Sequence, residues 1–349
     1  MTLRVIKDID PQLWNVFLKK QIFTIFVQSP DYGDFYRSMS EKAWIWGIVD
    51  ESNNLVGGSL IVSVHARRGN FIFVPYGPIF DSELTEDELK TAFDIFIKEL
   101  QLFAHKEKYD FIRCSPFFAD TPNWREAFSQ RGFRLAPMHI LAEYTWLLDI
   151  TKSEDELLKG MEKNHRNLIR RCEKEGIRVD ISVTSEALVD FNDLLDATAL
   201  RQNFHRFPIE YIKKEFFSFA LRGEAVVIRA YLPDGTLDTA GIFMFYGTMS
   251  CYRHAASKLT DKKIPTSYSV QWTAIQEAKR RGCTRHNFWG IAPPDADSSH
   301  PFYGLTHFKK GFGGQPYALL PCHDLPISWR YWFTWFVEKI RSVKRGFAK

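Results

Sequence analysis

The sequence runs through the same order of predicted elements twice, and this repetition limits its fold more than any other feature. In the first half, strand-like runs precede an amphipathic helix over residues 85–106 and a further strand at 110–114. In the second half, strand-like runs precede a helix over residues 265–281 and a strand at 286–290. A period of about 180 residues is too long for a solenoid, so the pattern indicates that one domain has been duplicated.

The strand-like runs before each helix are separated by short turns. They lie at residues 43–49, 55–64 and 70–74 in the first half and at 225–232, 239–246 and 250–255 in the second. Antiparallel strands followed by a helix and one more strand describe a mixed α/β fold with largely antiparallel sheets, not an all-parallel dinucleotide fold. Neither G-x-G-x-x-G nor G-x-x-x-x-G-K-[ST] occurs, so these nucleotide-binding loops are not predicted.

At 349 residues the chain is long enough for two domains with separate cores. We predict one domain over residues 1–150 and a second over 151–323, with a C-terminal helix in 324–349 that packs on the first domain or on a membrane. Hydrophobic residues make up 45% of the chain and charged residues 25%, which is typical of a globular protein.

Charge and cysteine usage restrict the class of protein further. A net charge of +4 is small for a protein whose main work is binding duplex nucleic acid. The five cysteines are dispersed without a C-x-x-C pair, which argues against disulfides and zinc and favours a reducing cytoplasm. The charged N-terminus does not resemble a signal peptide, and no apolar run reaches the roughly 18 residues of a transmembrane helix. We therefore predict a cytoplasmic protein.

Residues 149–176 join the two halves and are predicted to form a helix. Ser153 and Glu156 have the spacing of a capping box, and Gly176 can end the helix. The second half of this helix is dense in basic residues, namely Lys163, His165, Arg166, Arg170, Arg171 and Lys174. Such a face is either simply solvated or a contact for an RNA backbone or pyrophosphate, to which arginine is well suited.

A second basic feature lies at residues 198–206. If this segment is helical, Arg201 and His205 lie on one face, four residues apart. The two residues form either an ordinary surface pair or a phosphate-binding site.

Residues 287–314 combine glycine and proline with aromatic and basic side chains, and they are predicted to form a functional loop. Lys309 or Lys310 can place an ammonium beside a developing oxyanion, the electrostatic device that acyl transfer most needs. Alternatively, both lysines only solvate the loop. A G-x-S-x-G nucleophile elbow and an H-E-x-x-H metal motif are absent, and no metal site is predicted.

Four motifs follow one another along the chain, at residues 28–33, 111–116, 163–179 and 308–314. Together they resemble the FemABX family of peptidoglycan-bridge aminoacyltransferases. Residues 28–33 resemble its Gln-Ser-x-x-Trp-Gly, with Tyr32 in place of Trp, and residues 111–116 resemble its Phe-x-Arg-x-Asp-Pro. Residues 163–179 resemble its basic helix, and residues 308–314 match its Phe-Lys-x-Gly-Phe-Gly-Gly. The resemblance covers nearly the whole chain. Without a charged heptad pattern in its second half, the chain resembles the compact members that lack a coiled-coil arm.

The resemblance implies a fold of two tandem domains like the Gcn5-related acetyltransferases. It also implies an enzyme that moves an amino acid from aminoacyl-tRNA to an amine on the stem peptide of a peptidoglycan precursor linked to UDP or undecaprenyl. Aminoacyl-tRNA is then a co-substrate, and no cofactor is implied.

The resemblance also implies roles for individual residues. By motif position, Lys309 stabilises the tetrahedral intermediate, Phe308 shapes the cleft beside it, and Arg201 holds a phosphate of the precursor. Ser115 replaces the family's acid, which excludes a carboxylate base there. The other substrate-binding candidates are Tyr252, His205, His254, Tyr36 and Arg37, the last in place of a lysine of the family. The candidates for tRNA contact are Arg166, Arg170 and Arg171.

Residues 327–349 combine aromatic and basic residues in one predicted helix. This composition suits the inner face of a membrane, where anionic lipids attract cations, and it also suits packing on the first domain. Two other functions stay open: an acyltransferase of the same fold that uses acyl-coenzyme A or an acyl-carrier protein, and a non-catalytic RNA- or lipid-binding relative. The absence of the coenzyme-A pyrophosphate loop, Arg/Gln-x-x-Gly-x-Gly/Ala, favours the aminoacyltransferase.

Overall fold

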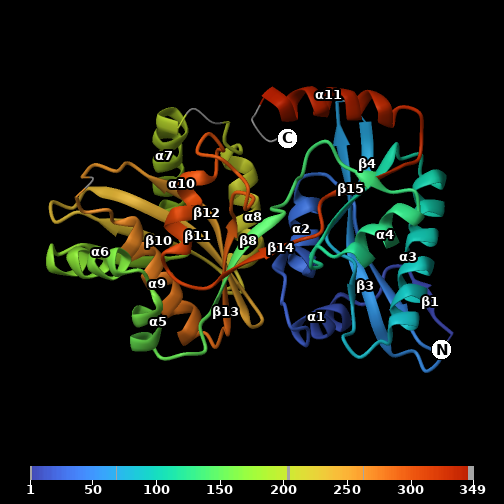
Figure 1. The fold of residues 1–349 in the computed structure, drawn as a ribbon, viewed down its shortest axis with the longest axis horizontal. Helices are drawn as coiled ribbons and strands as arrows, with labels where there is room; N and C mark the ends of the chain where they lie inside the picture. Colours follow the sequence, from blue (N-terminus) through green and yellow to red (C-terminus); the bar gives the residue numbers. More distant parts are fainter. Residues whose placement is uncertain (1, 68, 203–204, 262, 345–349) are drawn as a thin grey trace. The chain divides into compact units, whose positions relative to one another are not determined.

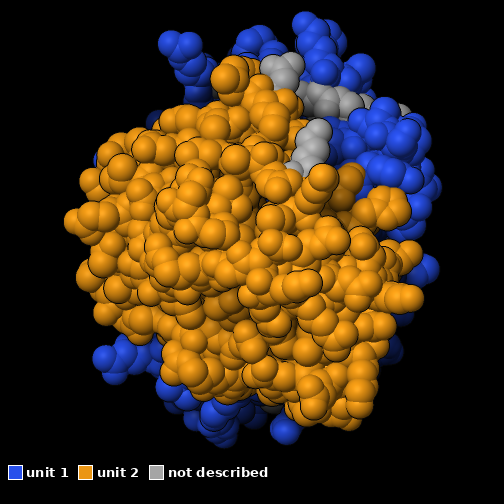
Figure 2. Space-filling model, turned by 90° about the vertical axis from the view of Figure 1, so that its left-hand side faces the viewer, with its two compact units in different colours: residues 1–144, 292–303, 317–349 blue, residues 145–291, 304–316 orange. Residues whose placement is uncertain are grey.

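The computed structural model describes residues 2–67, 69–202, 205–261 and 263–344. It divides into two compact units (Figure 2). Unit 1 comprises Met1–Tyr144, Ala292–Tyr303 and Tyr317–Lys349, and unit 2 comprises Thr145–Ile291 and Gly304–Pro316. The sequence predicted a boundary at residue 150 and a C-terminal helix packed on the first domain or on a membrane. In the structure the first boundary follows Tyr144, and residues 292–303 belong to unit 1 together with residues 317–349.

Unit 1 is built on a mixed sheet in the order β1-β2-β3-β4-β6-β15-β7, with β5 paired to β3 (Figure 1). Its strands are β1 (Arg4–Ile6), β2 (Ala43–Val49), β3 (Leu55–Ala66), β4 (Gly69–Tyr76), β5 (Ile79–Phe80), β6 (Phe111–Pro116), β7 (Arg134–Leu135) and β15 (His323–Pro326). β4 and β6 are parallel, since a helix connects them, and β15 is antiparallel to β6. The helices are α1 (Pro11–Lys19), α2 (Pro30–Ser38), α3 (Glu86–Lys106), α4 (Pro122–Gln130) and α11 (Tyr331–Lys344), with a 3-10 turn at Phe26–Gln28.

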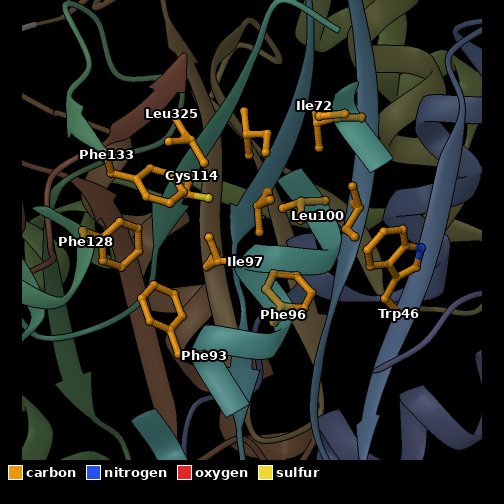
Figure 3. Packing of buried hydrophobic residues seen from close by; sticks show 14 of the residues in the cluster. Trp46, Ile72, Phe93, Phe96, Ile97, Leu100, Cys114, Phe128, Phe133 and Leu325 are labelled. Carbon is orange, nitrogen blue, oxygen red and sulfur yellow. The ribbon is translucent and has the colours of Figure 1, made fainter. Parts of the chain in front are cut away.

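Helix α3 packs on this sheet and supplies much of the core of unit 1. It begins with a capping box in which Thr85 and Glu88 satisfy each other's backbone N–H groups. Its apolar residues recur at spacings of three and four and so form one face. Figure 3 shows this face directed at the strands, and it includes Phe93, Phe96, Ile97 and Leu100.

Unit 2 has a sheet in the order β14-β8-β13-β12-β11-β10-β9. Its strands are β8 (Tyr144–Asp149), β9 (Arg178–Ser182), β10 (Ala225–Tyr231), β11 (Leu237–Tyr246), β12 (Met249–Ser257), β13 (Arg285–Gly290) and β14 (Gln315–Ala318). β12 and β13 are parallel and are connected through α9 (Ser267–Arg280). The other helices are α5 (Glu154–Gly160), α6 (Lys163–Lys174), α7 (Ser185–Gln202), α8 (Ile209–Ala220) and α10 (Tyr303–Lys310).

The two sheets have the same strand order when read from their first strands, β1 and β9. The sixth position of each sheet, however, is filled by a strand from the end of the other repeat. β8 follows β7 along the chain and joins the sheet of unit 2, whereas β15 follows β14 and joins the sheet of unit 1. This exchange of strands explains why the C-terminal segment belongs to unit 1.

A buried ion-pair network fixes the C-terminal segment in unit 1. Arg113 of β6 donates two hydrogen bonds to Asp324 of β15, at 2.7 and 2.8 Å. It donates a third to Glu338 of α11 at 2.7 Å. The side chains of Arg113 and Asp324 are 2% and 0% exposed, so this charged pair lies fully inside the protein.

The predicted strands and the helices at 85–106 and 265–281 are confirmed within a few residues at their ends. Three local predictions are wrong. The helix expected within residues 149–176 is two helices, because Met161 is extended and Glu162 N–H donates to the carbonyl of Gly311. Part of the loop expected at 287–314 is helix α10, and the start of the helix expected in 324–349 belongs to strand β15. Among the described residues, no helix is both long and apolar enough to span a bilayer.

Candidate active site

The parallel strands β12 and β13 of unit 2 are paired over a short stretch only. Their register runs from Met249 and Arg285 to Cys251 and Asn287 and ends there, although both strands continue. The equivalent strands of unit 1, β4 and β6, stay paired over six positions, from Phe71–Phe111 to Tyr76–Pro116. The second halves of β12 and β13 are thus separated in unit 2, and side chains from α8 and α10 meet the strands there.

A β-bulge in β12 interrupts the usual alternation of its side chains where the two strands separate. Tyr252 pairs with Phe243 and His254 pairs with Ile242, so that Arg253 is an extra residue in β12. As a result, two consecutive side chains reach the same partner, Glu215 of α8. Arg253 donates to Glu215 at 2.7 Å, and His254 Nε2 lies 2.8 Å from the other carboxylate oxygen.

This cluster keeps Glu215 ionised although its side chain is buried. Burial opposes ionisation, but the charge of Arg253 and the hydrogen bond from His254 outweigh it and lower the pKa of Glu215 to about 2. Burial also lowers the pKa of His254, against the opposing effect of Glu215. The cluster is therefore a fixed, charge-compensated support behind the separated strands.

The end of β13 is irregular. Trp289 has a left-handed backbone with φ of 64°, which is strained for a side chain of this size. Its N–H donates to Asn287 Oδ1 at 2.8 Å, and its ring lies 5.0 Å from the guanidinium of Arg253. The irregularity places the carbonyl of the next residue, Gly290, against α10.

Lys309 of α10 occupies this position. Its side chain is buried, and Nζ donates to the carbonyl oxygen of Gly290 at 2.5 Å. Burial lowers the pKa of the Lys309 ammonium to about 7. Nearby His286 is neutral at pH 7, because burial and, second, the charge of Lys309 lower its pKa to about 3. A buried amine with a pKa near 7 therefore lies where β12 and β13 separate.

His165 of α6 fixes the segment that carries Lys309. Its Nε2 lies 2.9 Å from the carbonyl oxygen of Phe308, and its ring packs against Phe312 with centroids 5.0 Å apart. A Cβ atom on Gly311 would lie 1.9 Å from Cε1 of His165, so any larger residue there must displace the His165 ring or the chain at Gly311. Burial lowers the pKa of His165, which makes it a neutral packing residue and not one of the exposed cations of the basic helix.

The glycines that follow have left-handed backbones, with a φ of 87° at Gly313, and Gly314 also lies close to a neighbouring strand. A Cβ atom on Gly314 would lie 2.3 Å from the carbonyl oxygen of Leu147 in β8, and Gly314 has a φ of 90°. Trp146 Nε1 of the same strand donates to the carbonyl of Gly313 at 2.6 Å. Each glycine of the run Phe-Lys-Lys-Gly-Phe-Gly-Gly therefore has a structural role. Lys309 is the residue of this run whose side chain can take part in a reaction.

Comparison with known proteins identifies the family. A model of the FemAB family matches residues 127–234 and 233–339, which together exceed half of the chain. The chain belongs to the FemAB family. The lipid II:glycine glycyltransferase of Staphylococcus aureus is 23% identical over 254 residues, with 53% of this chain and 60% of the relative covered. The chain thus matches less than two thirds of the length of that FemAB relative.

Solved structures show the fold. FemX has a TM-score of 0.82 at 18% identity, with 97% of this chain and 100% of FemX covered. A tandem GNAT protein from the clavulanic acid biosynthesis pathway has a TM-score of 0.58 at 10% identity, with 94% and 99% covered. The prediction of two tandem Gcn5-related acetyltransferase-like domains is confirmed.

Several predicted site residues of this FemAB chain lie in unit 2 with Lys309. Phe308 packs on Tyr268 with ring centroids 5.1 Å apart. Tyr252 stacks on Phe243 at 5.0 Å, and burial raises the pKa of its phenol, which stays a neutral donor. Arg201, at the end of α7, donates to the carbonyls of Ser257 and Lys258 at 2.5 and 2.7 Å, where β12 ends.

Other predicted residues are placed differently. α7 ends at Gln202, so the expected helical pairing of Arg201 with His205 is wrong; His205 is exposed beyond the helix end, past residues 203–204, which lie outside the described residues. Tyr36 and Arg37 lie on α2 of unit 1, where Arg37 donates to Asp34 at 2.7 Å and to the carbonyl of Ala43 at 2.9 Å.

The three arginines expected to contact tRNA differ in their surroundings. Arg166 donates to backbone carbonyls at the end of α5, including that of Met161 at 2.5 Å. Arg171 donates to the carbonyl of Lys263 at 3.1 Å, and Arg170 is exposed on the surface of α6. Arg166 therefore caps a neighbouring helix, whereas Arg170 and Arg171 are both exposed on α6.

Sequence reasoning did not single out Glu215, Arg253 or His286. An isolated glutamate in an amphipathic helix is typical of a solvated face, and nothing in the sequence of α8 indicated otherwise. Trp289 lies in the glycine- and aromatic-rich stretch 287–314 that is predicted to be functional, and this position is the signal that the sequence offers for it.

Proposed function

We propose that this protein transfers an amino acid from aminoacyl-tRNA to an amine on the stem peptide of a peptidoglycan precursor linked to UDP or undecaprenyl. The observation that carries the proposal is Lys309, a buried amine with a pKa of about 7 at the open ends of β12 and β13. Membership of the FemAB family and the similarity to a lipid II:glycine glycyltransferase support the choice of acyl transfer.

In the proposed reaction, the acceptor amine attacks the ester carbonyl that joins the amino acid to the terminal ribose of tRNA. The carbonyl oxygen becomes an oxyanion, and the ammonium of Lys309 stabilises it. The attack forms the C–N bond, and collapse of the tetrahedral intermediate restores the carbonyl and breaks the C–O bond to the ribose. The proton lost by the attacking amine is taken up by the departing ribose oxygen. Aminoacyl-tRNA serves as co-substrate, and the reaction requires no cofactor.

We also propose residues that bind the two substrates. Arg201, exposed at the end of α7, is proposed to hold a phosphate of the precursor. Tyr252 and His254 of β12 are proposed as further contacts of the precursor. Arg170 of α6 is proposed to contact the tRNA backbone, since its guanidinium is exposed. Phe308 shapes the space next to Lys309.

The proposal is tested by offering purified protein a pool of charged tRNAs carrying labelled amino acids, with UDP-linked and lipid-linked muropeptides in parallel reactions. A third reaction offers labelled acetyl-coenzyme A to the same acceptors. Label that passes from tRNA to either muropeptide supports the proposal, and repeating the reaction with single amino acids names the donor. Label that passes only from acetyl-coenzyme A, or no label at all with folded protein, contradicts it.

A further inference from the structure

Helix α11 of unit 1 has the reverse of the usual amphipathic arrangement. Helices of globular proteins normally bury an apolar stripe and expose a polar face. The buried residues of α11 are Tyr331, Thr334 and Ser342, and half-buried Glu338 lies on the same face. Tyr331 donates to Asp324 at 3.3 Å and Glu338 accepts from Arg113 at 2.7 Å, so polar contacts fix the helix to the unit.

The outward face carries most of the apolar residues of α11, whereas Trp335 and Val337 are half-buried. Phe333, Phe336, Ile340 and Val343 recur at spacings of three and four and therefore form one stripe. Phe333 is 60%, Phe336 61% and Val343 61% exposed. Trp332 borders this stripe, and Trp329, 79% exposed, continues it before the helix begins. We call these six residues the α11 stripe. Figure 1 shows α11 (red) at the periphery of unit 1.

Basic residues border the α11 stripe. Arg330, Lys339, Arg341 and Lys344 are all exposed, and Glu338, the helix's acidic residue, is engaged with Arg113. At the start of the helix, a cavity of about 450 Å³ is lined by Trp329, Phe333, Arg330 and Arg67, together with Asn70 and Asp110. Its acidic member, Asp110, accepts hydrogen bonds from Ser328 and from the N–H of Asn70. The cations of this surface thus outnumber Asp110, and its net charge is positive.

We propose that the α11 stripe binds the surface of a bilayer that contains anionic phospholipids, with the helix lying in the plane of the headgroups. A stripe of two phenylalanines, two tryptophans and two aliphatic residues matches the boundary between headgroups and acyl chains, where tryptophan is favoured. The bordering cations then lie at the level of the lipid phosphates. The positive charge favours this occupant over a second copy of the chain, which would bring the same cations together.

This proposal does not depend on the transfer reaction proposed above, because it concerns a surface of unit 1 and can be measured without tRNA or precursor. If both hold, the bilayer surface brings the enzyme to a lipid-linked acceptor. Failure of vesicle binding with intact transfer, or the converse, separates the two proposals.

The test is co-sedimentation of the full chain with vesicles of equal parts phosphatidylglycerol and phosphatidylcholine, and with vesicles of phosphatidylcholine alone. The double variant Phe333→Ser/Phe336→Ser removes the centre of the stripe, and Arg341→Gln/Lys344→Gln removes two cations. Leu221→Ser is the matched control, because Leu221 is 87% exposed and lies in unit 2. Circular dichroism establishes that each variant is folded.

The wild type and Leu221→Ser are expected to bind the anionic vesicles, and salt is expected to weaken this binding. Each double variant is expected to lower the partition coefficient by about tenfold or more. Equal binding to both vesicle types, no binding by the wild type, or unchanged binding by both variants would overturn the proposal. A dimer in light scattering that Phe333→Ser/Phe336→Ser disperses, without vesicle binding, would assign the stripe to a second copy instead.

Discussion

The imidazole ring of His165 occupies the space that a side chain on Gly311 would need, with 1.9 Å left between a Cβ atom and Cε1. The substitution Gly311→Ala must therefore displace His165 or the end of α10, which carries Lys309. We expect Gly311→Ala to lower the free energy of unfolding by about 1–3 kcal/mol, as overpacking of a dense core does, and to reduce transfer. Urea denaturation and a transfer assay measure the two effects.

A double-mutant cycle with His165→Ala isolates this clash. If the ring is the obstacle, the variant His165→Ala/Gly311→Ala is more stable than the sum of the two single effects predicts. Additive effects within about 0.5 kcal/mol would show that His165 and Gly311 are not coupled.

The Glu215 cluster predicts that the free energy of unfolding depends strongly on a single carboxylate. Glu215→Gln leaves the buried guanidinium of Arg253 without its counter-charge, and we expect a loss of about 3–5 kcal/mol at pH 7. Because the pKa of Glu215 is about 2 when folded and ordinary when unfolded, its contribution is present above about pH 4.5 and disappears as the pH falls toward 2. The difference between wild type and variant should therefore shrink in denaturation curves recorded at decreasing pH. A pH-independent difference would contradict this account.

Arg113 tests whether the C-terminal segment is an integral part of unit 1. Arg113→Met leaves the carboxylate of Asp324 buried and unpaired, and we expect unfolding to become easier by about 3–5 kcal/mol. Glu338→Gln is the matched control, since Glu338 is partly exposed and its contact with Arg113 contributes about 1 kcal/mol or less. Equal effects of the two variants in thermal denaturation would argue against the buried pair as the anchor of β15.

Lys309 is expected to reduce stability at neutral pH, as a buried functional amine does. Its pKa is lowered from 10.5 to about 7 on folding, so the unfolded chain binds more protons between these values. Stability therefore rises with pH in this window, by about 2 kcal/mol between pH 7 and pH 9. Lys309→Met lacks this dependence, so subtracting its free energy of unfolding from that of the wild type leaves the rise. A flat difference would show that the amine keeps its ordinary pKa.

The sequence predicted those helices and strands that form because of residues close to one another in the chain. Strand 43–49 and helix 85–106 follow from alternation, helical periodicity and the capping pair Thr85 and Glu88, all of which act within a few residues. The exchange of β8 and β15 could not be predicted in this way, because strand pairing depends on contacts between residues far apart in the chain. Sequence order favoured neighbours in each half and so placed residues 324–349 outside the first sheet.

Local sequence patterns also could not predict some single residues of the site, because their roles depend on distant contacts. Lys309 was predicted from the match of residues 308–314 to the family motif Phe-Lys-x-Gly-Phe-Gly-Gly, whereas the residues alone left Lys309 and Lys310 as alternatives. His165 was read as a cation because its neighbours are basic, and only its burial beside Gly311 shows it to be neutral. Glu215 carries no local pattern, since its role arises from a bulge that brings Arg253 and His254 to one side of β12.

The most direct test of the account compares the transfer rates of Lys309→Met and Lys310→Met with that of the wild type, using charged tRNA and muropeptide. Both substitutions remove one positive charge from the same helix, but Lys309 is buried at Gly290 and Lys310 is exposed. We predict that Lys310→Met transfers at close to the wild-type rate and that Lys309→Met is slower by about 100-fold or more, as when an oxyanion donor is removed. Near-normal transfer by folded Lys309→Met would contradict the assignment of Lys309 to the reaction.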